Sequence, residues 1–243
     1  MIHTFFFSHS TSLMIVFITV EKMKTLITAH SGSDNTPDNS LEFVSYALKT
    51  SADALEIDVR KLNGKLVISH DEASDNLPTL QDAFSLVIQH PSMKVNCDLK
   101  ESNLELEVCQ LAASNHLEKR LILTGTVNAD LFPMHEFPDV QVYLNIELYV
   151  PNLYLNYREI PDFELKAAEE ILKVCHRSKI NTVNINQVIV TRRFIEILKK
   201  EGVGISAWTV DIPLEMDWFF SKGVTNMTTR NLAVALKRRL DQK

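Results

Sequence analysis

Residues 25–59 read TLITAHSGSDNTPDNSLEFVSYALKTSADALEIDV, and this stretch predicts the building unit of the fold. It opens on a short apolar run, Thr25–Ala29, and continues through a polar loop into Leu41–Thr50, where apolar residues recur every three or four positions. A second apolar run, Ala54–Val59, closes it. This order predicts a strand, a helix and a second strand. Because parallel neighbours need a crossover connection, the unit indicates a parallel sheet.

The same alternation continues to the end of the chain. Eight strands are predicted, at Thr25–Ala29, Ala54–Val59, Lys94–Leu99, Arg120–Leu123, Val140–Ile146, Thr182–Ile185, Gly204–Thr209 and Val224–Met227. The predicted helices are Leu41–Thr50, Leu80–His90, Leu104–His116, Asp162–Arg177, Thr191–Glu201, Leu214–Lys222 and Leu232–Leu240. Eight such units in 243 residues favour a closed (β/α)₈ TIM barrel, since these barrels typically have about 250 residues. Asn63-Gly64, between two β-like runs, predicts a small hairpin insertion after strand 2.

One domain is predicted, spanning residues 23–243, because no repeat, low-complexity segment or Pro/Gly-rich linker divides the chain. Residues 1–22 are interpreted as an extension outside the fold, with Met23 as a possible true start. The apolar run Leu13–Val20 is far shorter than the ~20 residues that a membrane-spanning helix needs. No stable membrane insertion is therefore expected.

The charge and the cysteines restrict the class of partner and the compartment. A net charge of −6 argues against binding to nucleic acid, which requires a basic surface. A small anionic substrate is compatible with it, because a bound cation inverts the field locally. Cys97, Cys109 and Cys175 form no CxxC pair and predict buried free thiols in a reducing compartment, so a cytoplasmic location is expected. No pattern predicts an oligomeric state.

Three acidic residues stand where predicted strands end, which is where barrel active sites are built. Glu56 and Asp58 are two residues apart on one strand, so their side chains point the same way. Buried together, two carboxylates repel each other unless a cation lies between them. Asp98, at the end of the next strand, would add a third oxygen, and such a set predicts Mg²⁺ or Ca²⁺ rather than Zn²⁺. The alternative is that these acids cap loops or pair with Arg60 and Lys100.

Two histidines accompany the carboxylates. His30 and His70 each follow an apolar run and precede a polar turn. A single histidine in such a place is more often structural, but a pair beside a carboxylate cluster suits acid–base catalysis, because imidazole exchanges protons near neutral pH. The other histidines lack this company and are interpreted as surface residues.

Residues 28–72 resemble the start of a glycerophosphodiester phosphodiesterase (GDPD). The family's His-Arg-Gly, Pro-Glu-Asn-Thr, Glu-x-Asp and His-Asp motifs correspond, in order, to His30-Ser31-Gly32, Pro37-Asp38-Asn39-Ser40, Glu56-Ile57-Asp58 and His70-Asp71. Later motifs correspond to Asp98-Leu99-Lys100, Trp208-Thr209-Val210-Asp211 and Gly223-Val224-Thr225-Asn226-Met227-Thr228-Thr229. The resemblance extends from about Thr25 to the last helix. Each motif is weak alone, but together and in the family's order they are specific.

The resemblance implies hydrolysis of a small-molecule glycerophosphodiester to an alcohol and glycerol phosphate. It implies that the metal ligands are Glu56, Asp58 and Asp98, that the acid–base pair is His30 and His70, and that Lys100 contacts the phosphate. It further implies that Asp38 replaces a glutamate near the metal, that Asn39 braces the site, and that Trp208 forms an apolar wall for the glycerol or head group.

Three positions depart from the family pattern. Ser31 replaces an arginine that helps to hold the phosphate, which removes a rigid bidentate donor. We hypothesise that Arg60, on the same strand face as the two carboxylates of the second strand, partly substitutes for it. Asp98 and Asp38 are each one methylene shorter than the glutamate of the family. A pocket altered in this way is expected to accept a different head group.

In the expected mechanism, one histidine removes a proton from the nucleophile and the other protonates the leaving alcohol. The nucleophile is either water or the substrate's own 2-hydroxyl, which gives a cyclic phosphate first. Two alternative functions remain open. One is a phospholipase or lyase resembling sphingomyelinase D, which shares the barrel and the ligand set but is as a rule secreted and disulfide-bonded. The other is a catalytically silent barrel that binds a phospho-ligand, with Ser31 as the sign of lost activity.

Overall fold

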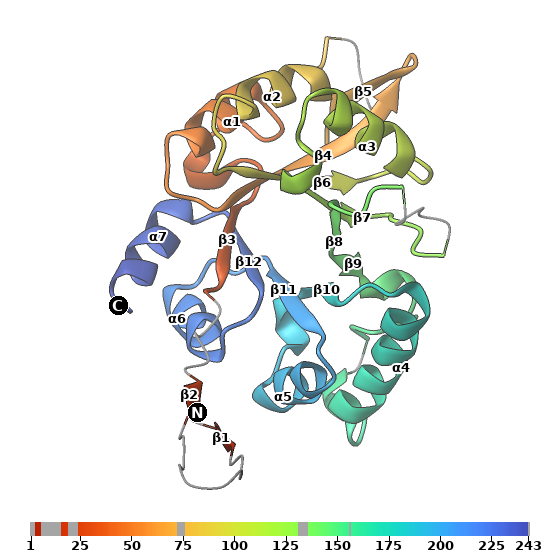
Figure 1. Cartoon of the computed structure of the whole chain (residues 1–243), viewed down its shortest axis with the longest axis vertical. Helices are drawn as coiled ribbons and strands as arrows, with labels where there is room; N and C mark the ends of the chain where they lie inside the picture. The colour runs from red at the N-terminus through yellow and green to blue at the C-terminus, as the bar shows by residue number, and fades with distance from the viewer. Residues whose placement is uncertain are drawn as a thin grey trace, which may run out of the picture.

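The structure, a computed structural model, describes residues 3–5, 16–18, 24–71, 76–130, 136–155 and 157–242. Its strands form a ring and its helices lie outside that ring (Figure 1). The strands of the ring are β3 (Leu26–Ala29), β4 (Ala54–Leu62), β6 (Lys94–Leu99), β7 (Leu121–Gly125), β8 (Gln141–Val142), β9 (Leu144–Asn145), β10 (Thr182–Asn186), β11 (Gly204–Trp208) and β12 (Asn226–Thr229). Each pair of hydrogen-bonded neighbours along the order β8-β7-β6-β4-β3-β12-β11-β10-β9 is parallel.

The two ends of this sheet meet at one interrupted strand. β8 pairs with β7, β9 pairs with β10, and only Tyr143 separates β8 from β9. The Tyr143 N–H donates to the carbonyl of Leu123 at 3.0 Å, so the chain stays hydrogen-bonded to β7 through the interruption. With β8 and β9 counted as one strand, the predicted eight-stranded barrel is confirmed.

The α-helices of the described residues agree with the predicted ones to within a few residues at each end. They are α1 (Leu41–Leu48), α2 (Leu80–Val87), α3 (Glu105–Ser114), α4 (Phe163–Ser178), α5 (Arg192–Lys200), α6 (Pro213–Lys222) and α7 (Leu232–Leu240). Short 3₁₀ helices lie at Ser33–Asn35, Glu118–Arg120, Ile146–Leu148, Tyr157–Glu159 and Gln187–Ile189. The last barrel strand differs most from its prediction: it ends at Thr229 because Thr228 and Thr229 pair with β3, and hydropathy alone does not mark threonines as strand.

The predicted hairpin is also present. β4 continues past its pairing with β6 and turns back as β5 (Lys65–Ile68), which pairs with it antiparallel. Asn63 and Gly64 form the turn with φ of 49° and 76°. Positive φ at both central residues is what a two-residue hairpin turn of type I′ requires.

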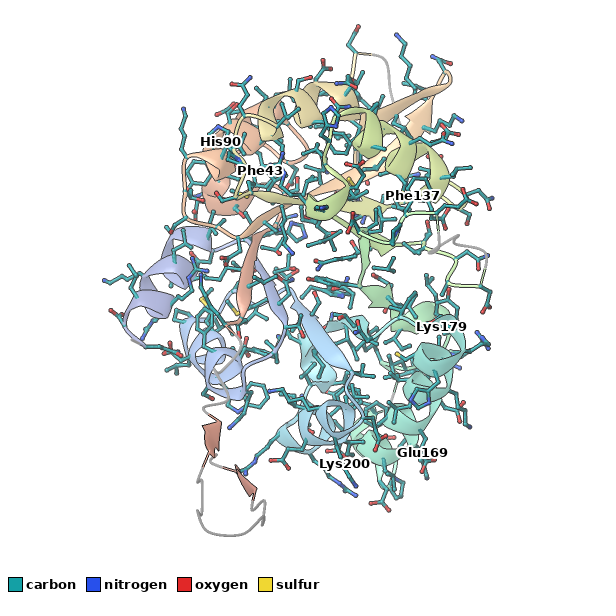
Figure 2. The ribbon with its side chains drawn as sticks, in the orientation of Figure 1. Phe43, His90, Phe137, Glu169, Lys179 and Lys200 are labelled. Carbon is teal, nitrogen blue, oxygen red and sulfur yellow. The ribbon has the colours of Figure 1, made fainter. Side chains whose placement is uncertain are left out.

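Apolar side chains fill the space between the barrel strands and the helices around them. Phe43 of α1 is fully buried and lies inside the helix layer, while Glu169, Lys179 and Lys200 lie on the outer elements and are exposed (Figure 2). Burial of this apolar surface is the main force that holds the helices on the barrel.

A chain of side-chain hydrogen bonds crosses five neighbouring strands inside the molecule. Thr28 donates to Asn226 at 2.7 Å, and the Asn226 amide donates to Ser206 at 3.0 Å. Ser206 donates to Asn184 at 2.9 Å, and the Asn184 amide donates to Asn145 at 3.0 Å. Buried polar groups are costly unless they are paired, so this network removes a penalty and fixes the side chains below the barrel mouth.

Two further strands, β1 (His3–Phe5) and β2 (Val16–Ile18), pair antiparallel with each other in a separate sheet. Most of residues 1–22 lie outside the described residues, so their position outside the fold stays a prediction. Within the described parts of the chain, no helix combines the length and the apolar character that crossing a membrane requires.

Candidate active site

A cavity of about 440 Å³ opens at the carboxyl ends of the barrel strands. Active sites of such barrels are built at this end, from residues that different strands and their loops contribute. The structure brings seven of the predicted site residues into its lining, namely His30, Glu56, Asp58, His70, Asp98, Lys100 and Trp208.

The three carboxylates of this cavity lie close enough to share one cation. One oxygen from each of Glu56, Asp58 and Asp98 lies within 4.8 Å of the other two. The sheet register explains this, because Asp58 of β4 stands directly beside Asp98 of β6, and Glu56 precedes Asp58 by two residues on the same face. Among the described residues, no other group of three or more His, Cys, Asp or Glu side chains is arranged in this way. Three carboxylate oxygens are the donors that Mg²⁺ and Ca²⁺ prefer.

Lys100 lies between two of the carboxylates. Its Nζ atom is 2.8 Å from Oδ1 of Asp58 and 2.5 Å from Oδ2 of Asp98. Burial acts against the charge of Lys100, but Asp98 and Asp58 outweigh it and raise its pKa. Burial likewise acts to raise the pKa of Asp58, but Lys100 and the hydrogen bond from Asn39 outweigh it and lower that pKa. Both groups are therefore charged near neutral pH.

Glu56 has less compensation. Burial raises the pKa of this carboxyl well above its usual range, and repulsion from Asp58 and Asp98 raises it further. Its Oε2 atom accepts the N–H of Ser31 at 3.0 Å and lies 3.7 Å from Nδ1 of His30. Three carboxylates beside a single ammonium leave an excess of negative charge, which a divalent cation would neutralise. The donor set and its charge thus both fit such an ion.

The loop after β3 braces the acidic cluster. The Asn39 side chain donates to Oδ2 of Asp58 at 2.7 Å and accepts the Asp58 N–H at 2.9 Å. The N–H of Asn39 in turn donates to Oγ of Ser31 at 2.5 Å. Ser31 is fully buried and does not line the cavity, so its hydroxyl holds the loop.

The two histidines of the cavity have different surroundings. The His30 side chain is 21% exposed, and Nδ1 lies 2.8 Å from the carbonyl oxygen of Ser31. Burial lowers the pKa of His30, and the nearby charge of Arg230 lowers it further against the opposing effect of the Ser31 carbonyl. The His70 side chain is 66% exposed, and its Nδ1 lies 3.0 Å from Oδ1 of Asp71. In the neutral form of His30, an Nδ1–H that donates to the Ser31 carbonyl leaves Nε2 of the same ring as a proton acceptor.

Three predicted site residues stay outside the cavity lining: Asn39, which braces Asp58, and the charged residues Arg60 and Asp38. Arg60 donates to the carbonyl of His70 at 3.1 Å and pairs with Glu101 at 3.2 Å. At this position β4 is already pairing with β5 in the hairpin, so the shared strand face no longer points toward the carboxylates. Asp38 is 58% exposed, pairs with Arg230 at 2.7 Å and is not one of the clustered carboxylates. The structure therefore places neither Arg60 nor Asp38 in the cavity lining, and their roles at the phosphate and near the metal stay predictions.

The sequence analysis missed several residues of the cavity. Arg230 follows β12 directly, as His30 follows β3, but the predicted strand ended at Met227, so the sequence did not place Arg230 at a strand end. Glu147 follows β9 and accepts hydrogen bonds from Asn145 at 2.9 Å and from Tyr154 at 3.2 Å. Other missed residues, such as Asn96 of β6 and Asn184 of β10, are polar and lie within strands. They carry no local signal, because hydropathy does not show which face of a barrel strand lines the cavity.

The predicted tryptophan also belongs to the cavity lining. Trp208 ends β11 and lines the cavity. Its indole Nε1 is buried and has no hydrogen-bond partner within the described residues. A buried donor without a partner is costly, and the role of Trp208 as an apolar wall for the substrate stays a prediction.

The sequence of this chain was compared with protein-family models and with curated proteins. No protein-family model matches the chain. Two curated relatives are named glycerophosphodiester phosphodiesterase. The one from Caldanaerobacter subterraneus is 23% identical over 253 residues, covering 85% of this chain and 94% of its own. The one from Bacillus altitudinis is 24% identical over 259 residues, covering 90% and 100%. The resemblance found in the motifs is thereby confirmed.

Solved structures show the same fold. A glycerophosphodiester phosphodiesterase from Parabacteroides distasonis superimposes with a TM-score of 0.71 at 17% identity, covering 91% of this chain and 99% of its own. A phosphodiesterase from Oleispira antarctica, solved in complex with the product sn-glycerol-3-phosphate, gives a TM-score of 0.67 at 16% identity and covers 90% and 97%. The barrel assignment is confirmed by these structures.

Proposed function

We propose that this protein is a phosphodiesterase that uses a divalent cation to hydrolyse glycerophosphodiesters to an alcohol and glycerol phosphate. The observation that carries the proposal is the convergence of Glu56, Asp58 and Asp98 within 4.8 Å in a cavity that His30 and His70 also line. The names of the curated relatives and the product bound in the Oleispira antarctica structure support the same substrate class.

The carboxylates Glu56, Asp58 and Asp98 would hold the cation, which we propose to be Mg²⁺ or Ca²⁺. When bound, it would neutralise charge on the phosphodiester and lower the pKa of a coordinated hydroxyl group. Asn39 keeps Asp58 in place for this task through two hydrogen bonds.

The side chains of the cavity would perform the proton transfers. One of His30 and His70 removes the proton of the attacking water or substrate hydroxyl, and the other protonates the leaving alcohol. Both histidines line the cavity, so each is within reach of a substrate bound there. Lys100, charged and held by two carboxylates, adds positive charge near the phosphate.

The remaining cavity walls suit a small polyol. Asn145 and Asn184 line the cavity and are fixed by the hydrogen-bond network of the barrel interior, so they can present polar atoms to the glycerol hydroxyls. Trp208 lines the cavity and would provide a flat apolar surface for the glycerol or head group. We propose a role in lipid and glycerol metabolism, and a cytoplasmic location in keeping with three free, buried cysteines.

The test is a matrix of metals and substrates measured on the full-length protein. Glycerophosphocholine, glycerophosphoethanolamine, lysophosphatidylcholine and sphingomyelin are incubated with EDTA, Mg²⁺, Ca²⁺ or Zn²⁺, and the release of glycerol phosphate and of free alcohol is measured. We expect turnover of the glycerophosphodiesters with Mg²⁺ or Ca²⁺ and none with EDTA. Turnover of the choline lipids alone would favour the sphingomyelinase D-like alternative, and no turnover under any condition would favour the silent barrel.

A further inference from the structure

Arg230 projects into the mouth of the barrel from a fixed point of the main chain. It follows the last residue of β12, and its N–H donates to Oδ1 of Asp211 at 2.7 Å. Its carbonyl accepts the N–H of Asp34 at 2.9 Å. The residue is therefore anchored on both sides, and its side chain lines the same cavity as the carboxylates and histidines.

The guanidinium group is only loosely neutralised. Its Nη1 atom donates to Oδ1 of Asp38 at 2.7 Å, and the two side chains are 45% and 58% exposed. An ion pair this exposed contributes little free energy, because water screens both charges. Within the described residues, the hydrogen bonds of the Arg230 side chain involve Nη1 alone, so its other N–H donors are available to a ligand.

The loop after β3 leaves room for this guanidinium. Gly32 has a φ of +76°, and a Cβ atom added there would lie 2.8 Å from Nη1 of Arg230 and closer still to the Asp38 carboxylate. A side chain at this position would therefore displace the ion pair from its place beside His30. The glycine keeps the pair at the rim.

The other permanent cation of the lining is already engaged. The Lys100 ammonium contacts Asp58 and Asp98, so its charge is largely balanced by those carboxylates. Among the described residues that line the cavity, Arg230 is the only arginine. A phosphodiester brings a negative charge into a cavity that already holds three carboxylates, and a cation at the rim that is not committed to them would offset part of it beside the proposed divalent ion.

We propose that Arg230 binds the phosphate group of the substrate and exchanges its contact with Asp38 for phosphate oxygens. This inference rests on the proposed function of the cavity. A guanidinium suits the task because its planar fork can donate to two phosphate oxygens at once. Asp38 holds the fork in place in the free protein and is released at small cost, since the pair is exposed.

Four variants of the full-length protein test the proposal. R230M removes the charge and the fork, R230K keeps the charge alone, and D38N frees Arg230 from its partner. R238M is the matched control, since Arg238 pairs with Asp217 at 3.1 Å, is 39% exposed and lies on α7 outside the cavity lining. For each protein, kcat and KM for glycerophosphocholine, Kd for sn-glycerol-3-phosphate by calorimetry, and Tm are measured.

We expect R230M to raise both KM and Kd about ten- to one-hundred-fold, the usual effect of losing a hydrogen bond to a charged group. R230K should give an intermediate value, R238M no change, and D38N an unchanged or lower Kd. The Kd of D38N is the decisive readout, because a merely structural ion pair would be weakened equally by loss of either partner, and Kd would then rise in D38N as it does in R230M.

Two results would overturn the assignment of Arg230. One is a wild-type KM and Kd in R230M, and the other is the same loss of affinity in R230M and D38N. If the wild-type protein cleaves glycerophosphodiesters in either case, the proposed function stands and only the assignment of Arg230 fails. If it binds sn-glycerol-3-phosphate through Arg230 but cleaves no phosphodiester, the proposed function fails and the assignment stands. A wild-type protein that neither binds sn-glycerol-3-phosphate nor cleaves a phosphodiester would contradict both the proposed function and the assignment of Arg230.

Discussion

Asn39 and Asp58 hold each other through two hydrogen bonds that join a loop to a barrel strand. The Asn39 amide donates to the Asp58 carboxylate at 2.7 Å, and the N–H of Asp58 donates back to the Asn39 side-chain oxygen at 2.9 Å. This arrangement sets the direction in which the Asp58 carboxylate presents its other oxygen. Outer residues that orient a ligand in this way contribute to the affinity for a metal without touching it.

Asn39→Ala should therefore weaken the binding of Mg²⁺ or Ca²⁺ by about 10- to 100-fold, as is usual for the loss of a supporting hydrogen bond. The measurement is a calorimetric titration with each ion. Asn35→Ala is the control, because Asn35 also has a positive φ, 65° against 48°, but is exposed. An equal loss of metal affinity in the two variants would show that the change at a backbone position of positive φ causes the loss, and not the hydrogen bonds to Asp58.

A bound cation should stabilise the protein. A ligand that binds only the folded state at 100 times its Kd adds about 2.7 kcal/mol, which corresponds to a rise in Tm of roughly 5–10 °C for a chain of this size. Asp98→Asn should remove most of this rise. Asp130→Asn should keep it, since Asp130 pairs with Arg177 at 2.9 Å outside the cavity lining. A wild-type Tm that is insensitive to both Mg²⁺ and Ca²⁺ would contradict the metal site.

Loss of either cavity histidine should slow the reaction. His30→Ala and His70→Ala should each reduce turnover by at least about 10²-fold, because each would remove a general acid or base. His176→Ala, an exposed histidine on α4, serves as the control and should leave turnover unchanged. Steady-state kinetics with glycerophosphocholine provide the measurement. Near-normal turnover in both cavity variants would remove them from the mechanism.

Two glycines with the same backbone angle should respond differently to substitution. Gly32 and Gly64 both have φ of +76°, but a Cβ at Gly32 would collide with Asp38 and Arg230, whereas a Cβ at Gly64 meets nothing within 4 Å. Gly64→Ala should cost only the backbone strain, of order 1–3 kcal/mol in the free energy of unfolding. Gly32→Ala should cost more and should also raise KM. A similar KM in both variants would show that the Asp38–Arg230 ion pair does not contribute to substrate binding.

The cysteines should be unreactive in the folded protein. Burial raises the pKa of Cys109 to about 12 and that of Cys175 to about 11, and it raises that of Cys97 well above its usual range. A raised pKa means less thiolate at a given pH, and thiolate is the reactive form. At pH 8.5 a thiol reagent should label all three only after unfolding, and labelling of the folded protein should increase toward pH 11. Rapid labelling of the native protein at pH 8.5 would contradict this burial.

Much of the architecture follows from local patterns. The alternation of apolar runs and helical periodicity predicted the barrel, because strands buried on both faces and amphipathic helices each leave their own period in the chain. The hairpin turn was predictable from Asn63-Gly64, since two adjacent residues with positive φ favour this pair. That Glu56 and Asp58 would face the same way followed from the two-residue period of a strand.

The choice of arginine shows what local patterns leave open. Arg60 shares the strand period of the carboxylates, yet β4 has entered the hairpin at that point and its guanidinium binds Glu101. Arg230 lies 170 positions later in the sequence and reaches the cavity because β12 pairs with β3. The sequence by itself determined the strands, the helices and the acidic pair, which depend on neighbours along the chain. Only the tertiary structure decided which cations share the cavity with them, because closure of the barrel sets distances between residues that no local period relates.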